Sequence, residues 1–235
     1  MLRSDFVAVL ITFAISLGWL RINDYAAHKG WISSRLSRKI IHIGTGPIFV
    51  LCWLLFTNTL ASRYIAALVP FAITVQFFLV GIGVIRDDAA VKAMSRTGNP
   101  REILRGPLYY RIIFVVLTII FWYESPIGIV ALMLMCGGDG LADILGRRYG
   151  RTHIPWNPNK TYMGSLGMFI GGLSLSIMVL AIYVLVGIYT TPILALLPSL
   201  VIISLAGTLI ETLPLKDIDN ITVTVTAVIL GYFLF

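Results

Sequence analysis

Two aspartates four residues apart, Asp139 and Asp143, interrupt an apolar segment of the sequence. A carboxylate inside a membrane helix costs roughly 2.5–3.5 kcal/mol, so it usually faces a polar cavity and has a partner. Positions four apart share one helix face, with about 5–6 Å between their β-carbons. Two carboxylates at that spacing can hold Mg²⁺ against phosphate oxygens, since Mg²⁺ commonly takes one or two carboxylates plus phosphate and water. The pair therefore predicts a catalytic Mg²⁺ site.

Glycines at 137, 138 and 140 surround these aspartates. Because glycine costs about 1 kcal/mol relative to alanine in a helix, the three favour a break, a close helix contact or a close approach of backbone to ligand. Close helix packing with salt-bridged aspartates is the structural alternative, and the sequence leaves it open.

The segments that follow supply positive charge. Gly146 and Arg147 come directly after the acidic pair, and the next apolar segment opens with Asn159, Lys160, Thr161, Gly164 and Ser165. At such a helix start, free N–H groups, a hydroxyl and an ammonium converge, as in a phosphate site. The order G-x-x-x-x-G-K-[ST] is absent, and Lys160-Thr161 alone would more often be a helix cap. Beside an acidic metal site, the segment predicts nucleotide binding.

Earlier in the chain, Arg38, Lys39 and His42 enter the second apolar segment on one polar edge of a helix. They could reach phosphate, and His42 could relay a proton. A lone membrane-embedded histidine is also a common packing residue.

A fourth polar group joins the last two apolar segments. Glu211 ends one segment, and Asp217, Asp219 and Asn220 precede the next. These side chains could add metal ligands or contact a sugar hydroxyl, or they could form a solvated turn.

The elements that position these residues are predicted to be membrane helices. The 235 residues are 58% hydrophobic and 12% charged, with a mean hydropathy of +0.91, whereas soluble domains are about 45–50% apolar and about 25% charged. A span takes roughly 20 residues. We expect an all-α polytopic bundle of seven or eight spans, eight preferred, forming one domain over 1–235, from the apolar segments 5–21, 40–57, 63–85, 108–123, 126–146, 164–188, 192–211 and 221–235.

The basic residues alternate with these segments. The connections 21–39, 86–111, 146–163 and 211–220 hold 16 of the 18 lysines and arginines, whereas the other side has Arg3 and Arg63. Short basic loops stay in the cytoplasm, so the site should lie on the cytoplasmic face and both termini opposite. The net charge of +7 then reflects topology, and no nucleic-acid partner is expected. The connection 86–111 suits a short surface helix and a turn at 95–100, which could cap the site or simply connect helices.

Taken in order, the blocks resemble the phytol kinase and dolichol kinase family of CTP-dependent polyprenol kinases, with phytol kinases most similar. The resemblance lies in Arg38-Lys39-x-x-His42-x-Gly44-x-Gly46, in 101–110 (REILRGPLYY), in Gly138-Asp139-Gly140-x-x-Asp143-x-x-Gly146-Arg147, in Asn159-Lys160-Thr161-x-x-Gly164-Ser165, and in Glu211 through Asp219-Asn220-x-Thr222-Val223. The third and fourth blocks are also similar to phosphatidate cytidylyltransferases.

The resemblance implies transfer of the γ-phosphoryl group of CTP to a long-chain isoprenoid alcohol (phytol first, then geranylgeraniol or farnesol) in the membrane. Asp139 and Asp143 would bind Mg²⁺, and Lys160 and His42 would complete the catalytic group. The nucleotide would be bound by Arg38, Lys39, Gly138, Gly140, Gly146, Arg147, Asn159, Thr161, Gly164, Ser165, Glu211, Asp219 and Asn220. A cytidylyltransferase attacking the α-phosphorus is the second hypothesis, and an ion-coupled transporter is the third.

Overall fold

The structure is a computed structural model that describes residues 4–95, 97–215 and 218–235. Expectations that involve Arg3, Arg96, Lys216 or Asp217 lie outside the described residues. The described chain is almost wholly helical.

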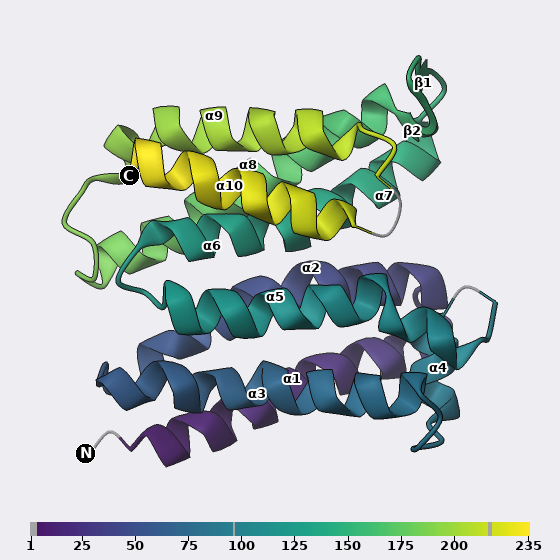
Figure 1. The fold of residues 1–235 in the computed structure, drawn as a ribbon, viewed down its shortest axis with the longest axis horizontal. Helices are drawn as coiled ribbons and strands as arrows, with labels where there is room; N and C mark the ends of the chain where they lie inside the picture. The colour runs from purple at the N-terminus through teal and green to yellow at the C-terminus, as the bar shows by residue number, and fades with distance from the viewer. Residues whose placement is uncertain (1–3, 96, 216–217) are drawn as a thin grey trace.

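The helices form two groups that lie one above the other in Figure 1. The first group comprises α1 (Asp5–His28), α2 (Ser34–Cys52), η1 (Trp53–Leu55), α3 (Leu60–Gly81), α4 (Asp88–Met94), η2 (Pro100–Leu104) and α5 (Gly106–Ile120). The second comprises α6 (Pro126–Met133), η3 (Leu134–Gly138), α7 (Asp139–Tyr149), β1 (His153–Ile154), β2 (Asn157–Thr161), α8 (Tyr162–Leu185), α9 (Ile193–Glu211) and α10 (Asp219–Leu234).

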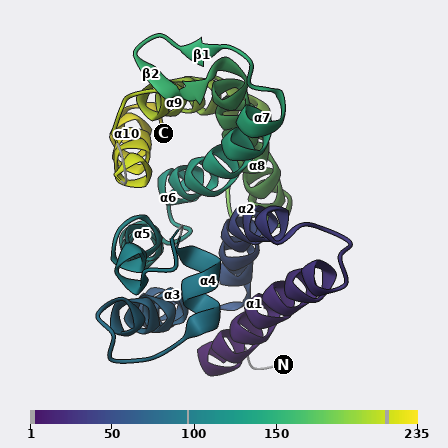
Figure 2. The ribbon, with the colours of Figure 1, turned by 90° about the vertical axis from the view of Figure 1, so that its right-hand side faces the viewer.

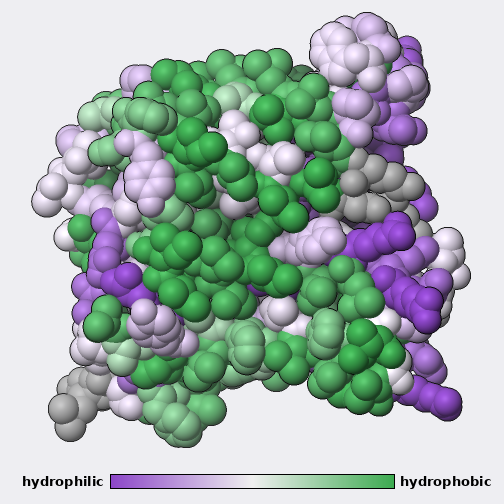
Figure 3. Space-filling model, viewed as in Figure 1, coloured by the Kyte–Doolittle hydropathy of each residue, from purple (hydrophilic) through white to green (hydrophobic). Residues whose placement is uncertain are grey.

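The predicted polytopic membrane architecture is confirmed. Seven helical stretches in the described chain are long and apolar enough to cross a membrane, and α6, η3 and α7 together form one of them, Pro126–Tyr149. The shorter apolar helix α10 follows, with 16 residues. In Figure 3 hydrophobic side chains cover the middle of the visible face, and most of the hydrophilic side chains gather at the right-hand end, with a smaller group at the left. That pattern fits a lipid-facing surface with a polar end.

The polar end is where the connections after α1, α3, α7 and α9 meet (Figure 1), whereas both chain termini lie at the opposite end. The grouping of the basic loops and the placement of the termini therefore agree with the charge pattern. Viewed from this end in Figure 2, α2 lies between α1 and the second group. A side chain from α2 can consequently reach α7.

The glycine-rich segment produces both a helix irregularity and a close contact. Residues Leu134–Gly138 form a π-helical turn, and α7 begins at Asp139. A Cβ on Gly137 would lie 2.7 Å from the Gly171 carbonyl oxygen, and a Cβ on Gly167 would lie 2.7 Å from the Leu141 carbonyl oxygen. Glycine at these two positions therefore lets α8 pack directly on the backbone of the segment that carries the aspartates.

A small hairpin departs from the all-α expectation. Strands β1 and β2 pair antiparallel between α7 and α8. The Asn157 side chain is buried and donates to the carbonyl oxygens of Thr212 (3.1 Å) and Leu213 (3.2 Å), just beyond α9. Thr161 caps α8 by accepting from Gly164 N–H at 3.1 Å. The hairpin thereby fixes Lys160 next to the end of α9.

The connection 86–111 contains the predicted short surface helix, α4, followed by η2. Its buried residue Ile103 packs with Phe77, Val80 and Leu108 of α3 and α5. The segment connects helices within the first group, and its packing is against that group.

Candidate active site

Asp139 brings the two helix groups together at their polar end. Its Oδ2 atom lies 3.2 Å from His42 Nε2 and 3.5 Å from Lys39 Nζ. Lys39 and His42 are three residues apart on α2, so they present side chains to the same neighbour. The His42 contact has ion-pair distance, but Nε2 has no partner with hydrogen-bond geometry in the described chain.

Asp143 follows one turn later on α7 and shares the same lysine. Its Oδ2 lies 3.7 Å from Lys39 Nζ, and its Oδ1 accepts from Arg147 Nε at 2.6 Å. Lys39 thus contacts both carboxylates of the predicted metal pair. Arg147 is on the same helix as Asp143 and is 60% exposed, so it is the outermost cation of the group.

Lys160 belongs to a second polar group, between β2 and the ends of α9 and α10. Its ammonium pairs with Glu211, which is buried, and lies 3.9 Å from Asp219 Oδ2. Burial alone would lower the pKa of Lys160, but the carboxylates of Glu211 and Asp219 more than offset burial and raise that pKa above its ordinary value. Lys160 is therefore a permanent cation at neutral pH.

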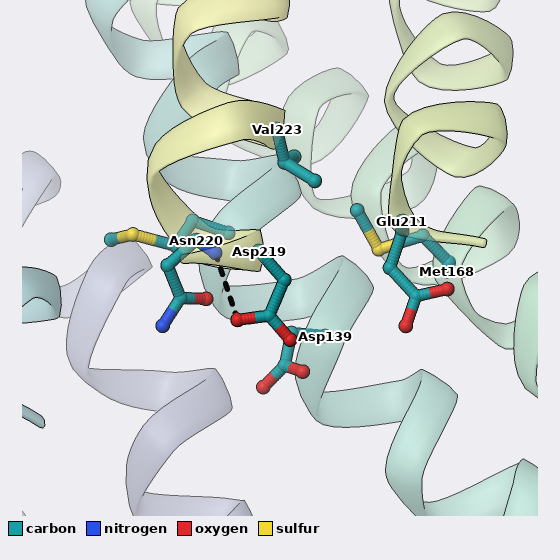
Figure 4. A pocket seen from close by; sticks show the side chains of 7 residues that line it. Asp139, Met168, Glu211, Asp219, Asn220 and Val223 are labelled. Atoms are coloured by element: carbon teal, nitrogen blue, oxygen red, sulfur yellow. Dashed lines mark hydrogen bonds between the residues drawn. The ribbon is translucent and has the colours of Figure 1, made fainter. Parts of the chain in front are cut away.

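The two polar groups face a common pocket (Figure 4). It is lined by Met135, Asp139, Met168, Glu211, Asp219, Asn220 and Val223. The carboxylates of Asp139 and Asp219 point toward one another there, and the Asp219 side chain accepts from Asn220 N–H at 3.1 Å. With an empty volume of about 200 Å³, the pocket is smaller than the roughly 300–1,000 Å³ of typical ligand sites. A nucleotide could therefore place at most its phosphate end beside these residues, with the remainder outside the pocket.

The donor set fits a divalent cation that is bound together with phosphate. No group of three or more His, Cys, Asp or Glu side chains within the described ranges forms a metal cluster. Two carboxylates are nevertheless enough for Mg²⁺ when phosphate oxygens and water complete its shell. The site has four acidic side chains (Asp139, Asp143, Glu211, Asp219) and three basic side chains (Lys39, Arg147, Lys160).

The predicted nucleotide-binding glycines are placed at helix contacts. A Cβ on Gly138 would meet Met168, one on Gly140 would meet Ile43, and one on Gly146 would lie 3.3 Å from Gly164 Cα. Their contacts in the structure are packing contacts, which is the helix-contact alternative left open by the sequence. Their role toward a nucleotide stays a prediction.

The other predicted residues divide by exposure. Arg38 and Asn159 are exposed near the polar end, whereas Thr161 is buried and caps α8. The Ser165 hydroxyl is buried and has no hydrogen-bond partner in the described part of the chain.

The site also contains a residue that reasoning from the sequence did not assign, Tyr110 of α5. Its ring lies 4.5 Å from the His42 ring between centroids, and its hydroxyl donates to the His42 carbonyl oxygen at 3.2 Å. The hydroxyl also lies 3.0 Å from Cys136 Sγ. The sequence does place a tyrosine inside an apolar segment, and the hydroxyl of a buried tyrosine usually has a hydrogen-bond partner.

Fold and site together define a class: a polytopic membrane enzyme whose carboxylates, lysines and histidine meet at one end of the helix bundle. Comparison with known proteins then gives the family. The chain is 40% identical over 233 residues to the probable phytol kinase 1, chloroplastic, of Oryza sativa subsp. japonica, covering 98% of this chain and 74% of the relative. It is 37% identical over 234 residues to the farnesol kinase, chloroplastic, of Arabidopsis thaliana, covering 99% and 76%.

Phytol kinase 1, chloroplastic, of Arabidopsis thaliana is 38% identical over 206 residues, covering 87% of this chain and 68% of the relative. No family model and no solved structure matches the chain. The chain belongs to the phytol kinase family. The resemblance seen in its motifs is thereby confirmed, and the enzyme class is that of a kinase.

Proposed function

We propose that this protein phosphorylates a long-chain isoprenoid alcohol with CTP, at the polar end of its helix bundle. The relatives named phytol kinase and farnesol kinase support the acceptor, with phytol first and farnesol or geranylgeraniol next. The position of Asp139 carries the proposal: its carboxylate contacts Lys39 and His42 of α2 and faces the pocket beside Asp219. An imidazole and an ammonium that can bind phosphate thus both contact one carboxylate.

Phosphoryl transfer depends mainly on positioning and on neutralising charge in a loose transition state. Lys160, Lys39 and Arg147 supply that neutralisation for the triphosphate of CTP. Asp139 and Asp143 would hold Mg²⁺, which would neutralise further charge on the phosphate oxygens. Lys39 contacts both aspartates, so its ammonium lies beside the residues that would hold the metal and could pair with a phosphate oxygen there.

The acceptor hydroxyl loses its proton late in such a reaction. His42 Nε2 and the Asp139 carboxylate lie 3.2 Å apart, so His42 accepts the proton and Asp139 stabilises the imidazolium that forms. The hydrocarbon chain of the alcohol stays in the membrane while its hydroxyl reaches the polar end. By the charge pattern this end is the cytoplasmic face.

Comparing two matched aspartate substitutions tests the proposal. We expect Asp139→Asn to lower turnover by at least about 10²-fold, because the group that joins metal, lysine and histidine loses its charge. Asp24→Asn is the control, since Asp24 is exposed on α1. Both purified variants are incubated with Mg²⁺, CTP or ATP, and a panel of phytol, farnesol and geranylgeraniol, and the products are weighed by mass spectrometry.

A kinase releases CDP and a prenyl phosphate, whereas a cytidylyltransferase releases pyrophosphate and a CDP-lipid from a lipid phosphate. Full activity of Asp139→Asn would refute the assignment of the site. Lipid-linked CMP as the product would refute the kinase. Flux of an ion without CTP turnover would support the transporter hypothesis.

A further inference from the structure

A second hollow lies in the first helix group, inside the membrane-spanning region. It is lined by Ser16, Trp19, Leu20, Thr45, Ile48, Phe49, Val69, Pro70, Ile73, Arg111 and Phe114. These residues come from α1, α2, α3 and α5, so four helices enclose one groove. The empty space among these side chains is about 460 Å³, part of which is open to the outside of the bundle.

Arg111 is the one charged residue of this groove. It is the sixth residue of α5 and lies within the predicted span Pro100–Ile120. Its guanidinium contacts the rings of Phe77 and Tyr110, at 5.5 Å and 5.4 Å from their centroids. No carboxylate pairs with it in residues 4–95, 97–215 and 218–235. Arg111 lies near the polar end of its helix, and charged residues within membrane-spanning helices often mark substrate pathways.

The groove runs from the polar end toward the middle of the bundle. α2 and α5 enter from the polar end, so Thr45 and Arg111 lie nearer that end than Phe49 and Phe114. α1 runs the other way, so Ser16 lies deeper than Leu20. The deep part of the groove is therefore mainly apolar, and the cation lies at its polar end.

The polar end of the groove adjoins the site around Asp139. Arg111 packs on the Tyr110 ring, the Tyr110 ring packs on His42 at 4.5 Å between centroids, and His42 contacts Asp139. Thr45 follows His42 by three residues on α2, so both lie on one face of that helix. Tyr110 and His42 thus connect the polar end of the groove to the Asp139 carboxylate.

We propose that this groove binds the isoprenoid chain of the alcohol, with Arg111 at the end of the groove where the hydroxyl lies, on the side of Tyr110 and His42. An apolar chain with one polar end matches the apolar lining and the single cation. This proposal rests on the proposed function for the identity of the acceptor. It adds where the chain lies and names Arg111 as a binding residue for the acceptor.

Filling the deep end of the groove tests the proposal. Ser16→Trp places an indole there, and the matched control Ala14→Trp places one on the exposed side of the same helix. We expect Ser16→Trp to lower kcat/KM for phytol by at least about tenfold, because overpacking displaces the chain. The shorter alcohol geraniol, which need not reach Ser16, should lose less than about threefold, and Ala14→Trp should lose as little with either alcohol. Equal phosphorylation of phytol by the two variants overturns the proposal.

A labelling experiment on the unsubstituted protein gives an independent result. A phytol analogue with a diazirine near the end of its chain should crosslink to peptides containing 16–20 or 69–73, and excess phytol should suppress that labelling. Labelling of other helices alone overturns the proposal, as does groove labelling that a phospholipid suppresses and phytol does not. If Ser16→Trp loses both alcohols, it has lost its fold, and the crosslinking result decides.

Crosslinking requires no turnover. A protein that binds phytol in the groove but phosphorylates no alcohol would refute the proposed function and keep the groove. A protein that phosphorylates phytol but fails both tests would refute the groove and keep the function.

Discussion

At the scale of single residues, the unexpected contact is that of Lys39 with both Asp139 and Asp143. The sequence predicted the aspartates because their type and spacing are costly inside a membrane helix. Which basic residue pairs with them could not be predicted. Lys39 lies on a helix about 100 residues earlier in the sequence, and the other three basic connections also contain lysines or arginines that could have paired with the aspartates. Pairing between distant segments depends on helix packing, which residue types do not specify.

The pair of Lys160 and the buried Glu211 should be worth more than a surface ion pair. We expect Glu211→Gln to lower the free energy of unfolding by about 1–3 kcal/mol, because it leaves a partly buried ammonium with the more distant Asp219 alone. The double variant Glu211→Gln/Lys160→Met removes both charges and should recover part of that loss. Thermal unfolding in detergent measures both. A double variant no more stable than Glu211→Gln would contradict the coupling.

The raised pKa of Lys160 gives a prediction for pH. Burial pulls this pKa down but Glu211 and Asp219 raise it further, so Lys160 stays charged below the ordinary lysine value of about 10.4, and its charge is lost only as pH rises through the raised value. The unsubstituted protein should therefore show no alkaline loss of activity from Lys160 between about pH 7 and 9. In Glu211→Gln the carboxylate that raises the pKa of Lys160 is missing, so burial lowers that pKa. The activity that this variant retains should therefore begin to fall at a lower pH than the activity of the unsubstituted protein. Identical pH–rate profiles would count against this role of Glu211.

At the scale of elements, the glycine-rich segment was predicted to break its helix, approach another helix or approach a ligand. The structure has a π-helical turn at Leu134–Gly138 and a close contact of α7 with α8. The hairpin of β1 and β2 was not predicted, because two short strands containing Pro158 and several polar residues have no periodic signal. Its position depends on Asn157, whose buried hydrogen bonds reach the end of α9.

Contact between α7 and α8 should be sensitive to volume at Gly167. A Cβ there would lie 3.0 Å from Ala142 Cα, so we expect Gly167→Val to cost about 1–3 kcal/mol of stability and to displace the helix that carries both aspartates. Gly18→Val is the control, since a Cβ on Gly18 meets nothing within 4 Å. Unfolding temperature and kinase activity are measured for both. Equal behaviour of the two variants would show that the contact is not needed.

At the scale of the whole molecule, the alternation of apolar segments and basic connections predicted the seven or eight spans and the end at which the basic loops gather. It succeeded because lipid constrains every helix to a similar length and direction. The lateral arrangement of the helices could not be predicted in this way, because the placement of α2 between α1 and the second group depends on side-chain shape.

The compartment of the polar end can be measured with single cysteines. Cys52 and Cys136 are buried, so added cysteines should dominate labelling. Arg151 lies at the polar end and Thr191 at the opposite end, and both are exposed. In a bacterial host, a membrane-impermeant maleimide should label Thr191→Cys in intact spheroplasts and Arg151→Cys only after permeabilisation. The reverse pattern would place the site on the other face.

The most direct test of the central claim follows the phosphorus atoms of CTP. Purified protein is given phytol, Mg²⁺ and CTP labelled at either the α- or the γ-phosphorus, and the lipid product is separated and counted. The γ-label should appear in phytyl phosphate, the α-label should stay in CDP, and Asp139→Asn should abolish the transfer. An α-label in the lipid, or γ-transfer that Asp139→Asn leaves intact, would contradict the account.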